Sequence, residues 1–262
     1  MPFLCLGLLA VARRITAPAF LRYCAVFSLT LLYGVQGHGF DATVSHVIDG
    51  DTVILEQGEK VRLIGINAPE LGRDGRPSEP YAEAARRYLE KLVLGKTVTV
   101  TQGGEERDRY GRTLGTLTLP SGLDVQDALI KSGMSVTVAI SPNTDHVPAY
   151  LDSEATARAQ RLGIWSESPA FVFSTPGNRR RGFQIAEVTL TGMRETRANV
   201  YLDGEEFFSI QVPIRHWKAF SFARKLRDLD SPSIQARGWV VQRDRGYVMI
   251  VSHPSMLQAG DQ

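Results

Sequence analysis

An Asp-Gly pair between two alternating β-type runs constrains the fold of this chain more than any other feature. Asp49-Gly50 follows one such run, residues 42–48, and precedes a second, residues 52–56. An Asp-Gly pair in this setting is the strongest short-range signal for a β-hairpin. A third β-type run, residues 61–66, ends at a proline-containing loop. The sequence therefore predicts three consecutive strands whose connecting turns and loops carry polar residues.

Those polar residues form a candidate site, because the strand ends can bring them together. They are Asp49, Asp51, Arg62, Asn67 and Glu70. Carboxylate and amide oxygens are ligands for a hard divalent cation, and a guanidinium group makes bidentate contacts with phosphate. The mixture therefore predicts a site for a metal ion and a phosphate group.

Further β-type runs and amphipathic segments follow this site. We expect a helix from near Pro80 to Gly95 with Ser78 or Glu79 as its cap, strands at 97–101 and 114–119, a helix at 125–131, an extended segment at 134–140, and a helix at 145–162. Five strands with short helices at these intervals predict a mainly β fold with some α: an OB-type five-stranded Greek-key barrel with packed helices.

The second half of the chain predicts another small β unit. Residues 167–182 contain prolines, glycines and a run of three arginines, and this composition is typical of a linker. After it, strand-like runs occur at 184–193, 198–202, 207–212, 234–242 and 247–251, interrupted by a helix at about 213–226. We therefore expect a catalytic domain at 41–166, a linker at 167–182 and a second small OB-like β-barrel domain at 183–257.

The first 38 residues have the pattern of an N-terminal targeting segment. Arg13, Arg14 and Arg22 precede an apolar run at 23–35, and this segment contains no acid. The run is shorter than the roughly 20 residues of a spanning helix, which favours a cleaved signal peptide and a periplasmic or secreted protein. An uncleaved N-terminal anchor stays open, because no clean small-x-small cleavage signature follows. Both cysteines lie in this leader, so the mature chain would have no thiol chemistry.

The charge is unevenly distributed behind a formal net value of +2. Residues 41–166 carry 14 bases and 18 acids, whereas residues 167–262 carry 13 bases and 10 acids. The second half also interleaves bases with aromatic residues: Arg194, Arg197, Tyr201, Arg215, Trp217, Lys218, Trp239, Arg243, Arg245 and Tyr247. Either this set lines an OB-type nucleic-acid groove, or the aromatics form a core and the bases are solvated.

Each candidate residue has a functional and a structural interpretation. Asp51 lies past the turn and suits a cation, whereas Asp49 could serve only the hairpin. Arg62, in the middle of a β-type run, could bind phosphate or make a structural salt bridge. Glu70 could act on an attacking water or be a solvated loop acid. Arg112 could offset charge on a reacting phosphate or be an ordinary surface charge.

Four motifs together resemble the staphylococcal nuclease-like (thermonuclease) family over residues 42–166. They are Asp49-Gly-Asp-Thr-Val, Arg62-Leu-Ile-Gly-Ile-Asn-Ala-Pro-Glu70, Asp108-Arg-Tyr-Gly-Arg112 and Leu162-Gly-Ile-Trp-Ser166. The resemblance implies that Ca²⁺ is held by the Asp51, Asn67 and Ala68 positions, with Mn²⁺ or Mg²⁺ as alternatives. It further implies that Arg62 and Arg112 grip the scissile phosphate, that Glu70 acts on water, and that Tyr110 and Asp49 face the substrate.

Two positions depart from the family's pattern. The family commonly has an acid where this chain has Asn67, so one negative charge is lost and weaker metal binding is expected. The family often has tyrosines that stack on the nucleotide where this chain has residues 136–140, which contain no aromatic ring. Base stacking, worth about 1–3 kcal/mol per base, would then come from elsewhere.

The sequence therefore predicts a secreted, monomeric, Ca²⁺-dependent nuclease that hydrolyses DNA, RNA or both. Scattered histidines and the absence of Gly-x-Ser-x-Gly and Walker-type sequences argue against zinc hydrolase, serine hydrolase and P-loop chemistry. One alternative is a nuclease-like module that binds nucleic acid or a protein partner without cutting. Another is an envelope protein that keeps its leader; stable membrane association is not expected if the leader is cleaved.

Overall fold

The structure is a computed structural model that describes residues 39–72, 75–166, 172–173, 182–205, 207–221 and 232–259. The predicted leader and most of the predicted linker lie outside these residues. From His38 onwards the chain forms one compact unit. Among the described residues, no helix has the length and apolar character that crossing a bilayer requires.

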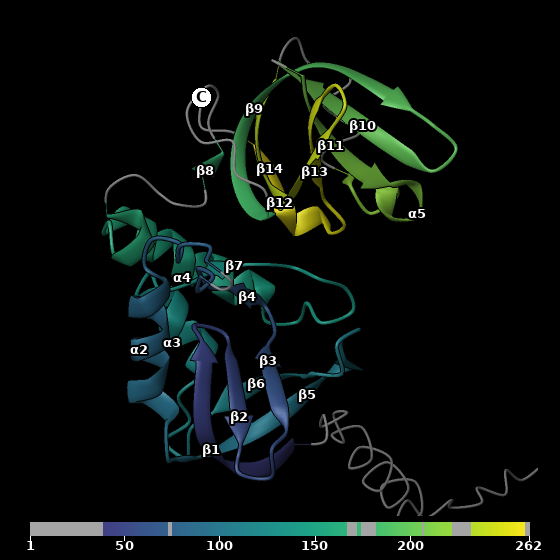
Figure 1. The fold of residues 1–262 in the computed structure, drawn as a ribbon. Helices are drawn as coiled ribbons and strands as arrows, with labels where there is room; N and C mark the ends of the chain where they lie inside the picture. The colour runs from purple at the N-terminus through teal and green to yellow at the C-terminus, as the bar shows by residue number, and fades with distance from the viewer. Residues whose placement is uncertain are drawn as a thin grey trace, which may run out of the picture. The chain divides into compact units, whose positions relative to one another are not determined.

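Five strands close a first barrel in the order β1-β2-β3-β6-β5 (Figure 1). The strands are β1 (Gly39–Asp49), β2 (Thr52–Leu55), β3 (Lys60–Leu63), β5 (Thr97–Arg107) and β6 (Thr113–Thr118). All neighbours are antiparallel except β3 and β6, which run parallel. This is the predicted five-stranded Greek-key barrel of the OB type, and the mainly β fold class is confirmed.

The predicted hairpin at Asp49-Gly50 is present and feeds the barrel core. Alternate apolar residues of β2 and β3 are buried, and so are Val44 and Val47, which lie on either side of an irregularity in β1; the set is Val44, Val47, Val53, Leu55, Val61 and Leu63. Burying one such side chain contributes roughly 1.5–3 kcal/mol, and a slip of one residue would turn them all outwards. The apolar pattern thus fixes the register that carries Asp51 to the end of the β1–β2 turn.

Helix α2 (Ala82–Val93) packs against β1 through Ala85, Leu89 and Val93. It begins two residues later than the sequence predicts, and Tyr81 precedes it in a left-handed conformation with φ of 69°. Neither predicted cap serves the helix. The Ser78 hydroxyl accepts from the backbone N–H of Gly72, and the Glu79 carboxylate accepts from that of Glu70. Both side chains therefore satisfy the loop after Pro69, whose backbone donors need partners more than the helix end does.

Two helices and a small two-stranded sheet complete the N-terminal half. Helix α3 (Val125–Lys131) packs against α4 (Val147–Ala159), and strand β4 (Ile66–Asn67) pairs with β7 (Val136–Thr137). Only β7 of the predicted extended segment at 134–140 is a strand. The reason is that β4 offers a partner for just two residues.

A second closed ring of five strands occupies the C-terminal half. Its strands are β9 (Gly182–Glu195), β10 (Asn199–Gly204), β11 (Phe208–Pro213), β12 (Ser233–Arg243) and β13 (Gly246–Ile250). They pair in the order β9-β10-β11-β13-β12, and β12 returns to β9. Again only the third and fifth strands, β11 and β13, are parallel. The second barrel therefore repeats the topology of the first, as the predicted OB-like domain requires.

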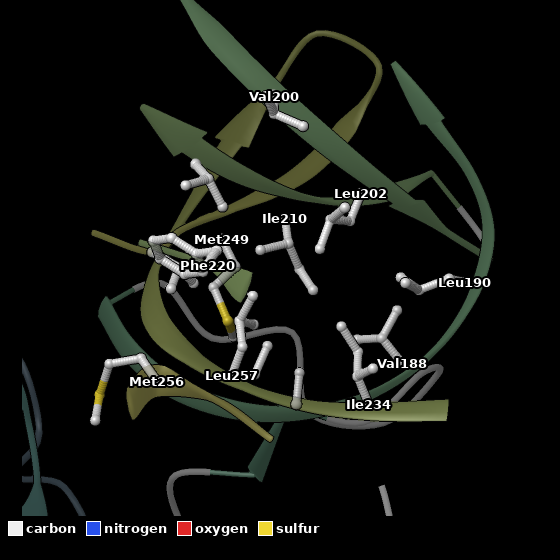
Figure 2. Packing of buried hydrophobic residues seen from close by; sticks show 14 of the residues in the cluster. Val188, Leu190, Val200, Leu202, Ile210, Phe220, Ile234, Met249, Met256 and Leu257 are labelled. Atoms are coloured by element: carbon white, nitrogen blue, oxygen red, sulfur yellow. The ribbon is translucent and has the colours of Figure 1, made fainter. Parts of the chain in front are cut away.

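The second barrel has its own apolar core, drawn in Figure 2. Labelled side chains from all five strands point into its interior, among them Leu190, Leu202, Ile210, Ile234 and Met249. The short strands β8 (Val172–Phe173) and β14 (Leu257–Ala259) flank the ring. Helix α5 (Ile214–Trp217) is shorter than the helix predicted at about 213–226, and residues 222–226 of that prediction lie outside the described residues.

A buried ion pair connects α4 to the second barrel. Glu154 of α4 and Arg237 of β12 are 2.6 Å apart, with side chains 0% and 4% exposed. The other carboxylate oxygen of Glu154 accepts a 2.7 Å hydrogen bond from the Thr137 backbone N–H. Removing one partner of such a pair typically costs about 3–5 kcal/mol, because it leaves an uncompensated buried charge.

Candidate active site

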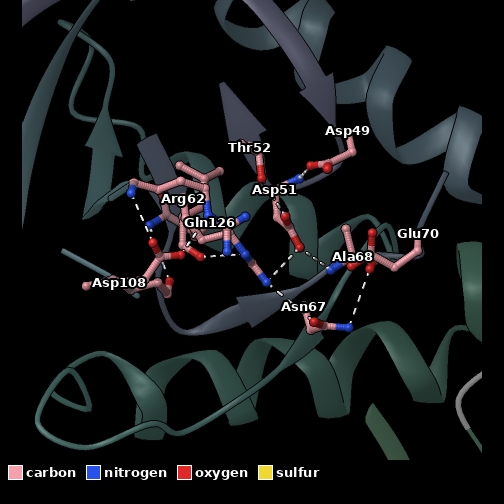
Figure 3. Close-up of polar contacts among 12 residues, drawn as sticks. Asp49, Asp51, Thr52, Arg62, Asn67, Ala68, Glu70, Asp108 and Gln126 are labelled. Carbon is pink, nitrogen blue, oxygen red and sulfur yellow. Dashed lines mark hydrogen bonds and ion pairs between the residues drawn. The ribbon is translucent and has the colours of Figure 1, made fainter. Parts of the chain in front are cut away.

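Asp51 is the centre of the candidate site (Figure 3). It directly follows the β1–β2 turn and is 4% exposed. Its Oδ2 atom lies 2.9 Å from Arg62 Nη2 and accepts a 2.9 Å hydrogen bond from the Ala68 backbone N–H. Its Oδ1 atom accepts from the Thr52 hydroxyl at 3.1 Å. One carboxylate thus ties together the turn, strand β3 and the loop that follows β4.

Gly50 permits this arrangement by its lack of a side chain. A Cβ atom at this position would come within 2.6 Å of the Ala68 Cβ and 2.7 Å of the Ala85 Cβ. Ala68 lies in the loop after β4 and Ala85 in helix α2. Their Cβ atoms are fixed to the backbone, so they cannot move aside as the end of a flexible side chain could. Close backbone approach therefore requires glycine in the turn, beyond the hairpin geometry that the Asp-Gly pair indicates.

Arg62 and Asn67 face each other beside Asp51. The Arg62 Nη2 atom lies 3.4 Å from Asn67 Oδ1, and its Nη1 atom donates to the Leu63 carbonyl at 2.8 Å. The Asn67 side-chain amide donates to the Ala68 carbonyl at 3.4 Å. Two oxygens from Asp51 and Asn67 therefore converge on a single cationic nitrogen.

Positive charge near Asp51 only partly offsets the effect of its burial. Its pKa is raised to about 7, chiefly by burial. The Arg62 guanidinium and the Ala68 N–H oppose this shift, while the Asp49 and Glu70 carboxylates add to it. The ionised form of Asp51 is therefore short of compensating charge, and a further cation at the site would stabilise it.

Glu70 lies on the exposed loop that follows Pro69. This loop is clamped at its base, since the Glu70 N–H donates to Glu79 Oε2 at 2.9 Å and the Glu79 N–H donates to the Glu70 carbonyl at 2.9 Å. The Glu70 carboxylate also contributes to the raised pKa of Asp51. An exposed acid held next to a buried one is suited to accept a proton from water.

Arg112 approaches the same edge of the barrel from the neighbouring strand. It directly precedes β6, and Thr113 pairs with Val61, next to Arg62. Its Nε atom donates to Asp108 Oδ2 at 2.7 Å, and its backbone N–H donates to Asp108 Oδ1 at 3.0 Å. Burial raises the pKa of Asp108, but the hydrogen bonds from Arg112 outweigh it and the pKa is lowered. Nη1 and Nη2 make no hydrogen bond within the described residues, which leaves them for a phosphate.

Tyr110 lies beside Arg112 on the same turn and is 69% exposed. The Arg112 guanidinium lies 5.7 Å from the centre of its ring, and that of Arg109 lies 4.8 Å from it. Tyr110 and Arg112 line a groove of about 440 Å³ with residues of the β2–β3 turn and Arg107. An exposed ring between guanidinium groups suits a nucleotide base next to its phosphate.

The structure thus gathers Asp51, Arg62, Asn67 and Ala68 into one contact cluster, with Asp49 hydrogen-bonded to the Asp51 N–H at 3.2 Å. Arg112 and Tyr110 form a second cluster around Asp108. Residues 136–140, where the family often has stacking tyrosines, offer little surface to a nucleotide in this structure. Val136 and Val138 are buried, and only Ile140 of this stretch is exposed.

Three residues have supporting roles that the sequence analysis did not assign to them. Asp108 orients Arg112, and its place in an Asp-x-x-Gly turn was the available signal. Glu79 holds the Glu70 loop. Gln126 is buried and joins β6 to the turn after β3, with its Oε1 accepting from Leu117 N at 3.0 Å and its Nε2 donating to the Ile64 carbonyl at 3.4 Å. A buried helical glutamine has no local sequence signature.

The ligand types at Asp51 fit a hard divalent cation. The Asp51 carboxylate, the Asn67 amide oxygen and the Ala68 carbonyl are all oxygen donors of the kind that Ca²⁺ takes. The Arg62 nitrogen already marks a point near which two of these oxygens converge. Within the described part of the chain, however, no three Asp, Glu, His or Cys residues group as a metal site.

Comparison with known proteins gives a consistent result. The family model for staphylococcal nuclease homologues matches residues 60–167, a range that includes Arg62, Glu70 and Arg112 and begins after Asp51. An uncharacterized endonuclease of Escherichia coli is 38% identical over 128 residues, 48% of this chain and 76% of the relative. A thermonuclease of Staphylococcus intermedius is 33% identical over 134 residues, 50% of this chain and 78% of the relative. Endonuclease YncB of Bacillus subtilis is 33% identical over 133 residues, 49% of this chain and 63% of the relative.

The close approach at Gly50 predicts that Gly50→Ala is destabilising. The added methyl group overlaps Ala68 and Ala85, and overpacking of this kind typically costs about 1–3 kcal/mol. Urea unfolding followed by circular dichroism measures the loss. Gly192→Ala is the matched control, because its Cβ would meet no atom within 4 Å. Equal unfolding midpoints for Gly50→Ala and the parent would contradict the packing described here.

Proposed function

The chain belongs to the staphylococcal nuclease family, and we propose that it is a Ca²⁺-dependent enzyme of the thermonuclease type that hydrolyses phosphodiester bonds in DNA, RNA or both. The nuclease relatives and the matched family region support a nuclease. The observation that carries the finer proposal is that strand β3 carries Arg62, that Arg112 directly precedes the neighbouring strand β6, and that the exposed acid Glu70 acts electrostatically on Asp51.

In the proposed reaction, a water oxygen attacks the phosphorus while Glu70 takes a proton from that water. The ester bond to the leaving oxygen breaks, and that oxygen takes a proton from solvent. Arg62 and Arg112 bind the phosphate oxygens and offset the negative charge that grows on them. Fixed donors of this kind typically contribute factors of about 10²–10³ to the rate.

Asp51, Asn67 and the Ala68 carbonyl would hold the divalent cation. When bound, the cation supplies Lewis-acid polarisation of the phosphate and orients water. Burial, Asp49 and Glu70 raise the pKa of Asp51, which is the electrostatic setting that a bound cation would relieve. Asn67 supplies an oxygen without a charge, so the site should bind Ca²⁺ more weakly than one with an acid at that position.

A second candidate function is a nuclease-like module that binds without cutting. The specific observation in its favour is that the described residues hold no group of three acidic, His or Cys side chains. Against it stands Glu70, an exposed acid next to the phosphate-binding groups, which a module that only binds a polyanion has no use for. Cleavage assays separate the two.

We further propose that the protein is periplasmic or secreted, and acts as a monomer. The basic, acid-free leader with its apolar run at 23–35 supports export. N-terminal sequencing of the protein recovered from an exporting host should find a start between the end of this run and Asp41. Recovery of the intact leader in the membrane fraction would instead support an anchored envelope protein.

Two substitutions test the catalytic assignment. We expect Glu70→Gln to lower kcat on single-stranded DNA or RNA by about 100-fold or more, because the proton acceptor is lost. We expect a similar loss for Arg112→Ala, because charge on the phosphate is no longer offset. Hydrolysis of labelled oligonucleotides in Ca²⁺, repeated in EGTA, measures both effects and the metal requirement.

The matched controls are exposed residues of the same type away from the site. Glu56→Gln and Arg197→Ala should cleave like the parent, since both side chains are exposed, one on the first barrel and one on the second. Circular dichroism should show that all four variants are folded. Near-parental cleavage by Glu70→Gln and Arg112→Ala would refute the catalytic assignment, and nucleic-acid binding without cleavage in any divalent metal would favour the binding module.

Asn67→Asp tests the metal site. The added carboxylate should tighten Ca²⁺ binding by about tenfold, or ~1.4 kcal/mol, because a charged ligand replaces a neutral one next to Asp51. Isothermal titration calorimetry of the metal alone measures the change. Asn199→Asp, the same substitution in the second barrel, should leave affinity unaltered, and an unchanged Kd in Asn67→Asp would place the cation elsewhere.

A further inference from the structure

The second barrel carries a groove of about 710 Å³ on its outer surface. Strands β9, β10, β11 and β13 and the β12–β13 turn line it. Its lining mixes cationic and aromatic side chains with polar ones, chiefly Arg194, Tyr201, Phe207, Gln211, Arg243 and Arg245. The core residues of the same strands point the other way, into the barrel shown in Figure 2.

The position of the groove corresponds to the binding face of OB-type barrels. Counted within the barrel, β10 and β11 are the second and third strands, and β12 and β13 are the fourth and fifth. OB folds bind oligonucleotides and oligosaccharides on the face of the second and third strands, between the loops that flank it. The sequence of the C-terminal half contains basic and aromatic residues suited to such a surface. The fold brings some of them, among them Arg194, Tyr201 and Arg245, into one groove.

Tyr201 forms the platform at the centre of the groove. It lies on β10 opposite Arg194 of β9 and Gln211 of β11. The Arg194 guanidinium lies 3.9 Å from the centre of the Tyr201 ring, and its Nε donates to Asp203 Oδ2 at 2.9 Å. A ring stacked against a fixed guanidinium group on a flat sheet face is suited to take a base on its open side.

Phe207 is held at the edge of the same groove, and it is 81% exposed. Its φ of 60° is in the left-handed region, which is strained for a residue with a bulky side chain. Gly246 holds this conformation in place, because a Cβ at Gly246 would come within 2.0 Å of the Phe207 carbonyl, and that carbonyl accepts from Tyr247 N at 3.0 Å. Strain of this kind, kept by the surrounding structure and presenting an apolar ring to solvent, points to a ligand.

The charge of the groove favours an anionic ligand. Arg194, Arg243 and Arg245 line it against one acid, Asp203. Asp203 is itself neutralised, since it accepts from Arg194 and, at 2.7 Å, from the Ser209 hydroxyl. Arg243 and Arg245 are exposed on the β12–β13 turn, which also carries Asp244. Phe207 lies against Gly246, next to Arg245, and Tyr201 lies further along β10. The groove therefore carries both the cationic and the stacking groups that bind the phosphates and bases of a single strand.

We propose that this groove binds single-stranded nucleic acid: bases stack on Tyr201 and Phe207, and Arg243 and Arg245 contact phosphates. The groove is a binding site separate from the candidate active site, and its assignment does not depend on whether the first barrel cuts. In a nuclease it would retain a long strand while the first barrel acts on it.

The test measures binding without cleavage. Full-length Glu70→Gln protein in EGTA is titrated into a fluorescein-labelled 12-nucleotide oligo(dT), and anisotropy is followed at several salt concentrations. Against this parent, Tyr201→Ala and Phe207→Ala should each weaken binding by about tenfold, the effect of losing one stacked base. Arg243→Glu with Arg245→Glu should weaken it further and flatten the slope of log K against log salt by about 0.7 for each phosphate that is no longer neutralised.

Arg215→Glu is the control for each arginine of the pair, because it makes the charge change of one such substitution at an exposed position of helix α5, outside the groove. It should retain parental affinity. Unfolding curves identify any variant that fails to fold; the turn arginines are exposed, so their variant keeps the proposal testable even if Tyr201→Ala does not fold.

Three results would overturn the proposal: groove variants that bind like the parent, an equal loss of affinity in Arg215→Glu, or poly-glutamate that displaces the oligonucleotide at equal charge, which would indicate a general anion surface. Cleavage assays stand apart from these results. If the protein cleaves nucleic acid but the groove variants bind like the parent, only this inference is refuted. If the protein binds through the groove but does not cleave, only the nuclease proposal is refuted.

Discussion

The contact between Asp51 and Arg62 is the interaction on which the candidate site depends. A buried carboxylate is costly unless charge and hydrogen bonds compensate it, and Asp51 finds these in Arg62, Thr52 and the Ala68 N–H. Those partners come from a turn, a strand and a loop that are otherwise separate. Satisfying one charge therefore places the residues proposed for phosphate binding and for the metal.

The partners of Asp51 do not fully compensate the cost of burying its charge, and this bears on the proposed metal site. The pKa of Asp51 stays raised to about 7 although Arg62 lies 2.9 Å away, because burial and two neighbouring acids oppose the arginine. A site that remains short of positive charge is prepared for a cation. Asn67 moderates this tendency, since it adds an oxygen near Arg62 without another charge. The nuclease relatives give this electrostatic setting its chemical context.

The same barrel topology occurs twice in this chain and is used differently each time. In the first barrel, polar residues gather at the end of the β1–β2 turn and along the β3–β6 edge, where the parallel pairing brings Arg62 and Arg112 to adjacent strands. In the second barrel, Arg194 of β9 and Tyr201 of β10 form a cation–aromatic pair, and the exposed Phe207 directly precedes β11. A topology therefore sets where groups can meet, while the side chains set what they bind.

Local sequence patterns determined much of this protein. The Asp-Gly hairpin, the strand runs of both halves and the grouping of Asp51, Arg62 and Asn67 followed from period-two alternation and turn chemistry, which act over a few residues. Tertiary structure decided the rest. Ser78 and Glu79 have the chemistry of helix caps but serve the Glu70 loop, because its backbone donors lie closer in space. Among the basic and aromatic residues of the second half, Trp217 is buried while Tyr201 and Arg245 line a groove. Which of these residues are buried and which line the groove depends on the pairing of β9 with β12 and of β11 with β13. These strands are far apart in the sequence, and local patterns act over only a few residues.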